Sequence, residues 1–100
     1  MKYTYCFDLD LTLCQTYDTD YVNAKPIENR IAFVNSLYDD GNFIKIHTAR
    51  GSESKIDFRN LTVNQLNLWG LKFHELHFGK PAADYYVDDK AVNCDDFNWG

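Results

Sequence analysis

The sequence has few cysteines, and their arrangement does not predict a disulfide framework. Cys6, Cys14 and Cys94 are odd in number, and no two of them have the C-x-x-C spacing of many metal and redox sites. Free, reduced thiols fit this pattern, as in cytosolic proteins. A zinc site built from His74 and His77 with Cys6 or Cys94 would require distant residues to converge, so we do not predict one.

Long hydrophobic runs are also missing. No apolar stretch approaches the ~20 residues that a membrane-spanning helix needs. Met1 and Lys2 lead into a short strand-like segment, without the apolar stretch and cleavage site of a signal peptide. We therefore expect no membrane partner and a cytoplasmic location.

Positive charge is scarce. Ten Lys and Arg residues stand against 15 Asp and Glu, which gives a formal net charge of −5. No basic run exists that could neutralise the phosphates of a nucleic acid, so nucleic acid is not an expected partner. The acidic residues gather near 8–20 and 84–96, a distribution typical of a site, although most of them are expected on a solvated surface.

The chain does have the material for a core. Hydrophobic residues make up 45% and aromatic residues 16% of the 100 residues, which excludes a disordered segment. The length suits one domain, and there is no repeat, linker or low-complexity segment. We predict a single domain over residues 1–100, with residues 11–25 as a small flap.

Strand and helix signals alternate along the chain. The residue patterns predict strands at 3–7, 42–47, 72–78 and 85–87, and helices at 26–41 and 54–69. The second helix has Phe58, Leu61, Leu68 and Trp69 available for a buried side. This alternation predicts an α/β fold with about four parallel strands and right-handed crossovers.

Polar residues follow the end of each predicted strand. They are Asp8 and Asp10, Thr48 and Arg50, Lys80, and the pair Asp88–Asp89. The carboxyl edge of an open α/β sheet is where ligands bind. Adjacent carboxylates repel each other, and a hard cation such as Mg²⁺ relieves this repulsion. Thr48 and Lys80 suit phosphoryl oxygens, so the set predicts a phosphate-plus-metal site where a carboxylate can accept a phosphoryl group.

These residues resemble the motifs of the haloacid dehalogenase-like (HAD) phosphohydrolases. The D-x-D-x-T motif is Asp8-Leu9-Asp10-Leu11-Thr12, and it is followed in the family's order by Thr48, Lys80 and Asp88–Asp89. The resemblance spans residues 3 to about 90. It implies a three-layer Rossmann-like core with the Asp8 strand central, and a Mg²⁺-dependent phosphatase.

The resemblance also implies a role for each residue. Asp8 attacks phosphorus, and Asp10 protonates the leaving oxygen and then activates water, while its carbonyl binds Mg²⁺. The phosphoryl group is held by Thr48 and Lys80, with Ala49 and Arg50 beside them. The metal ligands are Asp8, Asp10 and Asp88, with Asp89 as a neighbour or alternative ligand. Thr12 braces the loop.

Two departures from the family pattern matter. Many members have Gly where this chain has Leu11, and Leu predicts that the position is sterically ordinary. No insertion is long enough for a cap domain, so the chain is most similar to small capless phosphatases, including those of capsule and surface-polysaccharide synthesis. A sugar phosphate is therefore the expected substrate. A small sheet with an uncovered edge makes a homo-oligomer an expectation as well.

Other interpretations stay open from the sequence. Arg50 could contact substrate, or it could cap a helix or pair with a surface acid. Tyr17, Tyr21 and Trp99 suit packing better than a substrate platform. A receiver-like module with a phosphorylated Asp is an alternative function, although its acids would come in a different order. A non-catalytic metal-binding or assembly module is another.

Overall fold

The computed structural model describes residues 2–100 and contains a three-stranded parallel sheet. The strand order is β1 (Thr4–Asp8), β4 (Phe43–Thr48) and β5 (Glu75–Phe78). Helix α1 (Glu28–Asp39) connects β1 to β4, and α2 (Arg59–Leu68) connects β4 to β5. The predicted α/β class is confirmed, and the structure has no cap domain over residues 2–100.

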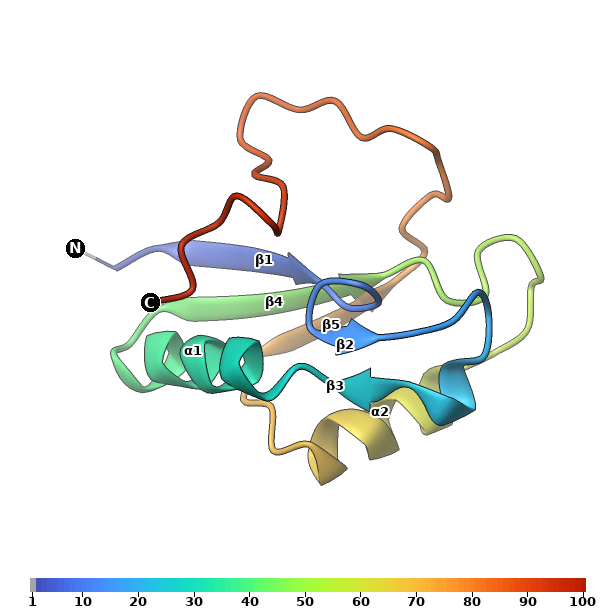
Figure 1. The fold of residues 1–100 in the computed structure, drawn as a ribbon, viewed down its shortest axis with the longest axis horizontal. Coiled ribbons are helices and arrows are strands. Elements are labelled where there is room, and N and C mark those ends of the chain that lie inside the picture. Colours follow the sequence, from blue (N-terminus) through green and yellow to red (C-terminus); the bar gives the residue numbers. More distant parts are fainter. Residues whose placement is uncertain (1) are drawn as a thin grey trace.

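The two helices lie on the same face of the sheet, below it in Figure 1, and the C-terminal segment arches over the other side. Two right-handed crossovers that step in the same direction across a sheet produce this arrangement. The expectation of a three-layer core with the Asp8 strand central is therefore not met in residues 2–100. β4 is the central strand, β1 is an edge strand, and none of the helices formed by residues 2–100 covers the second face.

The fourth predicted strand, at 85–87, is wrong because residues 79–100 form no strand or helix. The Tyr86 ring packs over the Lys80 ammonium, 4.1 Å from Nζ to the ring centroid, and its hydroxyl donates to the Pro81 carbonyl. Tyr85 and Val87 are 87% and 97% exposed. A run of three strand-forming residues is short, and here it is held by the Tyr86 contacts instead of pairing with β1.

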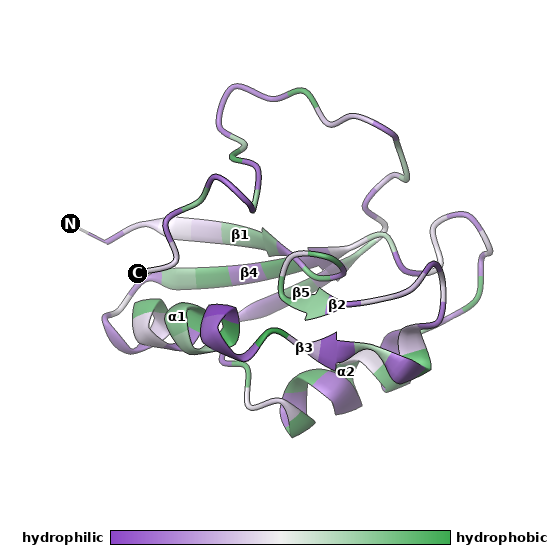
Figure 2. Cartoon of the chain, viewed as in Figure 1, coloured by the Kyte–Doolittle hydropathy of each residue, from purple (hydrophilic) through white to green (hydrophobic). Residues whose placement is uncertain are grey.

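The core lies between the sheet and the helices. Phe7, Ile44 and Ile46 alternate with more exposed residues along β1 and β4, and they pack against Ile31 and Val34 of α1. This period of two is what a strand with one buried face requires. Figure 2 shows hydrophobic residues along β1 and β4, whereas residues 79–100 have no long hydrophobic run.

Helix α2 differs from its prediction in length and in its buried side. It begins at Arg59 and not near residue 54, because residues 51–54 form turns and Lys55 has a φ of 63°. Its buried residues are Thr62, Gln65 and Leu66, whereas Leu68 is 84% exposed. Two of the three buried side chains are polar, so an apolar stripe could not identify this face.

Residues 11–25 form a loop closed by a short ribbon. β2 (Cys14–Gln15) pairs antiparallel with β3 (Lys25–Pro26), and a 3-10 turn (Tyr21–Asn23) lies between them. The C-terminal Phe97 and Trp99 pack on Phe7 of β1 and Phe33 of α1, with ring centroids 5.7–6.0 Å apart. No helix within residues 2–100 is long and apolar enough to cross a membrane.

Candidate active site

A cavity of about 240 Å³ opens at the carboxyl ends of β1 and β4. Its lining combines acids, two cations and several small or aromatic side chains: Asp8, Asp10, Leu11, Thr16, Asp18, Tyr21, Ala49, Arg50, Lys80 and Tyr86. Five of the residues predicted for the site, Asp8, Asp10, Ala49, Arg50 and Lys80, are therefore brought together here.

Asp8 and Lys80 form the exposed half of this site. The Lys80 Nζ lies 3.4 Å from an Asp8 carboxylate oxygen, and their side chains are 16% and 32% exposed. The Lys80 backbone is fixed from both sides, because its amide donates to the Thr48 carbonyl and the Ser52 hydroxyl donates to the Lys80 carbonyl. A carboxylate and a cation thus face the same cavity.

Asp10 and Arg50 form the buried half. The Arg50 Nε and Nη2 each donate to a different Asp10 carboxylate oxygen at 2.9 Å, a bidentate pair. Thr16 donates its hydroxyl to the same carboxylate at 2.6 Å. The Arg50 side chain is fully buried and that of Asp10 is 21% exposed. Such a geometry fixes both side chains in one orientation.

Arg50 also ties the site to α2. Its Nη1 donates to Thr62 Oγ1 at 3.0 Å and to Gln65 Oε1 at 2.6 Å, and its guanidinium lies over the Tyr21 ring at 4.7 Å. Gln65 in turn donates to the Tyr21 carbonyl. Arg50 therefore neither caps a helix nor pairs with a surface acid; it joins β4, α2 and the 11–25 loop around Asp10.

The pKa of Asp10 lies below its ordinary value. Burial by itself raises the pKa of this carboxyl, but the hydrogen bonds from Arg50 and Thr16 and the charge of Arg50 outweigh it. The neighbouring Cys14 shows the opposite result, since burial raises its thiol pKa to about 11. Asp10 is therefore a carboxylate at neutral pH, and Cys14 is an unreactive thiol.

Thr48 and Thr12 lie close to the cavity without lining it. The Thr48 side chain is buried, and its Oγ1 accepts a hydrogen bond from the Arg50 amide, which leaves its own proton available to donate. The Thr12 amide donates to the Leu9 carbonyl, and the Thr12 carbonyl accepts from Arg30. Thr12 thus belongs to the hydrogen-bonded turn after Asp10.

The structure does not bring Asp88 and Asp89 into the cavity. Both lie in the exposed C-terminal segment, and no group of three or more His, Cys, Asp or Glu side chains within residues 2–100 is placed to hold a metal ion. A hydrogen bond from the Lys90 amide holds the pKa of Asp88 below its usual range, and a hydrogen bond with the Asp89 side chain acts in the same direction. Their assignment as metal ligands stays a prediction from the motif.

Leu11 corrects an expectation directly. Its φ is 65°, in the left-handed region, so the position is not sterically ordinary. The Leu11 amide donates to the Cys14 carbonyl, and the amides of Thr12, Leu13 and Cys14 all point to the Leu9 carbonyl. The turn that places Asp10 imposes this backbone, and the strain lies next to Asp10, the predicted acid and base, as is typical of functional sites.

Replacing Leu11 by Gly should therefore leave the free energy of unfolding unchanged or raise it by up to about 1 kcal/mol, since Gly adopts a positive φ without strain. The Leu11 side chain is 61% exposed, so little burial is lost. Urea unfolding measures the change. Val22→Gly, at an exposed position in the 3-10 turn, is the control and should lower stability. A loss at Leu11→Gly as large as that of the control would contradict the strain.

The sequence reasoning missed several residues that build the site. Thr62 and Gln65 were missed because they are polar residues in an expected apolar face. Thr16 lies in a loop without a regular period, Tyr21 was assigned to packing and not to the site, and Tyr86 was taken as part of a strand. These residues could have been expected only if Arg50 had been predicted to be buried. A buried guanidinium group has no water to bond with, so it needs several hydrogen-bond acceptors nearby.

Comparison with known proteins supports the architecture. The crystal structure of a structural-genomics target from Vibrio cholerae is similar to this chain, with a TM-score of 0.85 and 28% sequence identity. The likeness covers 98% of this chain and 90% of that protein's chain. No family model and no curated protein matches the sequence. The α/β fold is thus shared over nearly the whole length.

Proposed function

We propose that this chain is a Mg²⁺-dependent phosphomonoester hydrolase with a HAD-type core, acting through an aspartyl-phosphate on Asp8. The observation that carries the proposal is the Asp8 carboxylate 3.4 Å from the Lys80 ammonium, in a cavity that it shares with Asp10. A carboxylate nucleophile and a cation for the phosphoryl oxygens are the two groups that such a transfer needs first.

The first step is attack by an Asp8 carboxylate oxygen on phosphorus, with departure of the alcohol oxygen. Lys80 offsets the negative charge on the phosphoryl oxygens while the phosphoryl group is transferred to Asp8. The Thr48 hydroxyl oxygen already accepts from the Arg50 amide, which leaves its proton free for a phosphoryl oxygen. Ala49 lines the cavity beside Arg50 and adds no charge to its wall.

Asp10 is suited to the second step. The Arg50 pair keeps it ionised and immobile, so it can take a proton from the water that attacks the aspartyl-phosphate. The resemblance also has Asp10 protonate the leaving oxygen in the first step, and for that role the negative charge of the bound phosphoryl group must raise its pKa above the lowered value of the free protein. Arg50 has all its donating nitrogens directed at protein acceptors, so we assign it to holding Asp10 and not to binding phosphate.

The donor set suits a hard cation. Asp8 supplies an exposed carboxylate and Asp10 a backbone carbonyl, and Mg²⁺ is commonly held by one or two carboxylates together with waters and substrate phosphate. When bound there, the ion would polarise the phosphoryl oxygens. Asp88 would add a further carboxylate from the exposed C-terminal segment. Both oxygens of the Asp10 carboxylate already accept hydrogen bonds from Arg50, and one also accepts from Thr16, so we assign the backbone carbonyl of Asp10 to the metal and its carboxylate to proton transfer.

Turnover of phosphomonoesters should require Mg²⁺. We expect p-nitrophenyl phosphate and sugar phosphates to be hydrolysed with Mg²⁺, the rate to fall to background with EDTA, and excess Mg²⁺ to restore it. Release of inorganic phosphate is the measurement. Substrates without a phosphoryl group should not react. A rate that EDTA leaves unchanged would contradict a metal-dependent mechanism.

The Asp88→Asn variant tests the proposed metal site without changing the proposed nucleophile. If Asp88 contributes a ligand, the Mg²⁺ concentration for half-maximal rate should rise by about tenfold, with a smaller effect at saturating Mg²⁺. Asp84→Asn, in the same exposed segment and without an assigned role, is the matched control. Equal Mg²⁺ requirements in the two variants would remove Asp88 from the proposed site.

A sugar phosphate of polysaccharide synthesis is the substrate that we propose from the family resemblance. A cavity of about 240 Å³ is small compared with the roughly 300–1,000 Å³ of most small-molecule pockets. It accommodates a phosphoryl group and the part of the substrate next to it, and the rest of a substrate would extend into solvent.

A further inference from the structure

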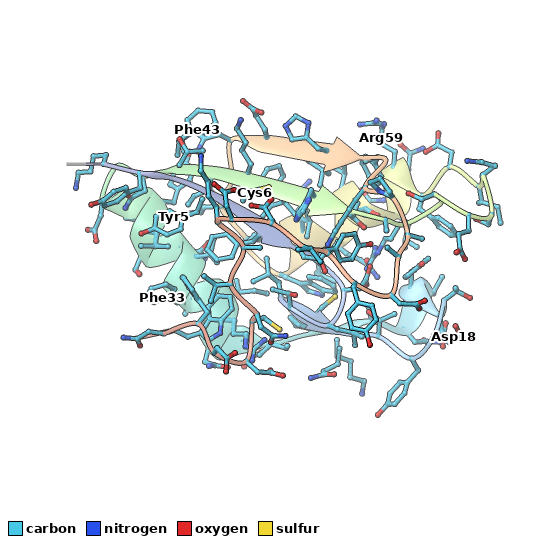
Figure 3. The ribbon with its side chains drawn as sticks, turned by 90° about the horizontal axis from the view of Figure 1, so that it is seen from above. Tyr5, Cys6, Asp18, Phe33, Phe43 and Arg59 are labelled. Carbon is cyan, nitrogen blue, oxygen red and sulfur yellow. The ribbon has the colours of Figure 1, made fainter. Side chains whose placement is uncertain are left out.

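Asp18 lines the same cavity as Asp8 and Asp10, although no motif assigns it a role. It lies on the loop between β2 and β3, and Figure 3 shows it at the end of the molecule where the strands finish, far from Phe43. Its φ is 52°, so the backbone holds an exposed aspartate in the left-handed region at this point. The loop therefore places a third carboxylate at the cavity.

The charges around the cavity do not balance. The lining residues comprise the three carboxylates of Asp8, Asp10 and Asp18 and the two cations of Arg50 and Lys80. Arg50 is buried and neutralises Asp10 through both carboxylate oxygens. Lys80 faces Asp8. Among the residues of the described chain that line the cavity, Asp18 is thus the carboxylate without an opposite charge.

A phosphoryl group would use the one accessible cationic side chain of the lining, Lys80, together with the Mg²⁺ ion proposed at Asp8. The Lys80 side chain is partly exposed to the cavity, whereas the Arg50 guanidinium group is enclosed by Asp10, Thr62 and Gln65. A second anionic group on the substrate would find no further cation in the lining and would face Asp18. The field of Asp18 also reaches the Tyr21 hydroxyl: burial and then Asp10 raise the Tyr21 pKa, and Asp18 acts in the same direction.

The remaining surface of the cavity suits carbon and hydroxyl groups. The Leu11 side chain is 61% exposed and the Tyr86 ring is 49% exposed, and both line the opening. Such surfaces contact the carbon faces of a neutral polyol or sugar ring without requiring charge.

We propose that Asp18 is a specificity-determining residue that restricts this site to phosphomonoesters with an uncharged leaving group, such as a neutral sugar. This inference rests on the proposed phosphatase function. It excludes sugar acids, bisphosphates and nucleoside diphosphates as good substrates, because each would bring a second anion toward the Asp18 carboxylate.

The test compares two open-chain substrates of matched size, sorbitol 6-phosphate and 6-phosphogluconate, which differ only at C1, a neutral hydroxymethyl group in the first and a carboxylate in the second. At low ionic strength we expect kcat/KM for the neutral substrate to exceed that for the acid by at least about tenfold. Asp18→Asn should reduce this ratio by about threefold or more, chiefly by raising kcat/KM for the acid. Asn tolerates a positive φ as well as Asp does, so the loop keeps its conformation.

Asp20→Asn is the matched control, since it removes the same charge from the same loop. Asp20 bonds to Asn23 through both carboxylate oxygens and does not line the cavity. It should leave the ratio of the two substrates unchanged. Equal kcat/KM values for the two substrates in the unmodified protein, or equal ratios in the two variants, would overturn the inference while the phosphatase function stands. Absence of turnover on any phosphomonoester would overturn the phosphatase function, and the inference with it.

Discussion

Asp8→Asn is expected to lower the rate of phosphomonoester hydrolysis on the order of 10³-fold or more. The amide oxygen is a poor nucleophile, and an acyl-phosphate cannot form on it as it does on a carboxylate. The fold should remain, because Asp8 has one charged partner, Lys80 at 3.4 Å, and both side chains are partly exposed. We expect the free energy of unfolding to change by less than about 1 kcal/mol. Release of inorganic phosphate and urea unfolding measure the two effects.

Asp40→Asn is the control for this experiment. Asp40 is an exposed aspartate at the C-terminal cap of α1 and does not line the cavity, so the rate should be unchanged. A second readout is the mass of the acid-quenched protein, which should show one added phosphoryl group in the unmodified protein and none in Asp8→Asn.

The alternatives predict different outcomes. A receiver-like module would acquire the phosphoryl group but would not cycle on p-nitrophenyl phosphate. A non-catalytic metal-binding module would lose Mg²⁺ affinity in Asp8→Asn and have no rate to lose. Substantial Mg²⁺-dependent turnover by Asp8→Asn would show that the proposed nucleophile is wrong.

The strand ends were predictable from sequence because apolar residues give way abruptly to polar residues there. Phe7 is buried and Asp8 follows it, and Ile46 is buried two residues before Thr48. Parallel strands have their carboxyl ends at one edge of the sheet, so the sequence alone indicated that Asp8, Asp10 and Arg50 lie close together. The local signal and the topology agree at these positions.

The interior of the site was not predictable in the same way. A periodic pattern identifies a buried helix face through apolar residues, but α2 buries Thr62 and Gln65 because its neighbour is a guanidinium. Leu11 shows a second limit. Its positive φ is imposed by four hydrogen bonds of the turn around Leu9 and Cys14, and residue identity alone indicated the opposite.

The prediction of a strand in the C-terminal segment was wrong for a third reason. Tyr85, Tyr86 and Val87 have strong strand propensity, but propensity in a sheet depends on the neighbours that a segment finds. Here Tyr86 packs on Lys80, and Phe97 and Trp99 cover Phe7 at the edge of the sheet. The first contact joins an aromatic ring to an ammonium group, and the second joins residues that are far apart in the sequence. A local residue pattern predicts neither kind of contact.

The Arg50–Asp10 pair gives stability a definite pH dependence. The pKa of the Asp10 carboxyl is lower in the folded protein than the value of about 3.9 expected when unfolded, so the unfolded chain binds the proton more readily. The stabilisation is therefore fully present above about pH 4 and is lost as the pH falls through the lower, folded pKa. Without Arg50, only the hydrogen bonds from Thr16 and Cys14 oppose the effect of burial, so the pKa of Asp10 rises and the stabilisation that its ionised form supplies above about pH 4 shrinks.

Arg50→Met should accordingly lower the free energy of unfolding by about 3–5 kcal/mol at pH 7, because it leaves a partly buried carboxylate without its partner. The loss should shrink toward pH 3, where Asp10 binds a proton in the variant. Adding Asp10→Asn to Arg50→Met should restore part of the stability, since no charge is then buried. Lys72→Met, which removes an exposed pair with Asp39 at 2.8 Å, is the control and should cost less than about 1 kcal/mol. Urea unfolding between pH 3 and pH 7 measures all four proteins. A loss for Arg50→Met that is no larger than the control, or that does not vary with pH, would show that this pair does not hold the site together.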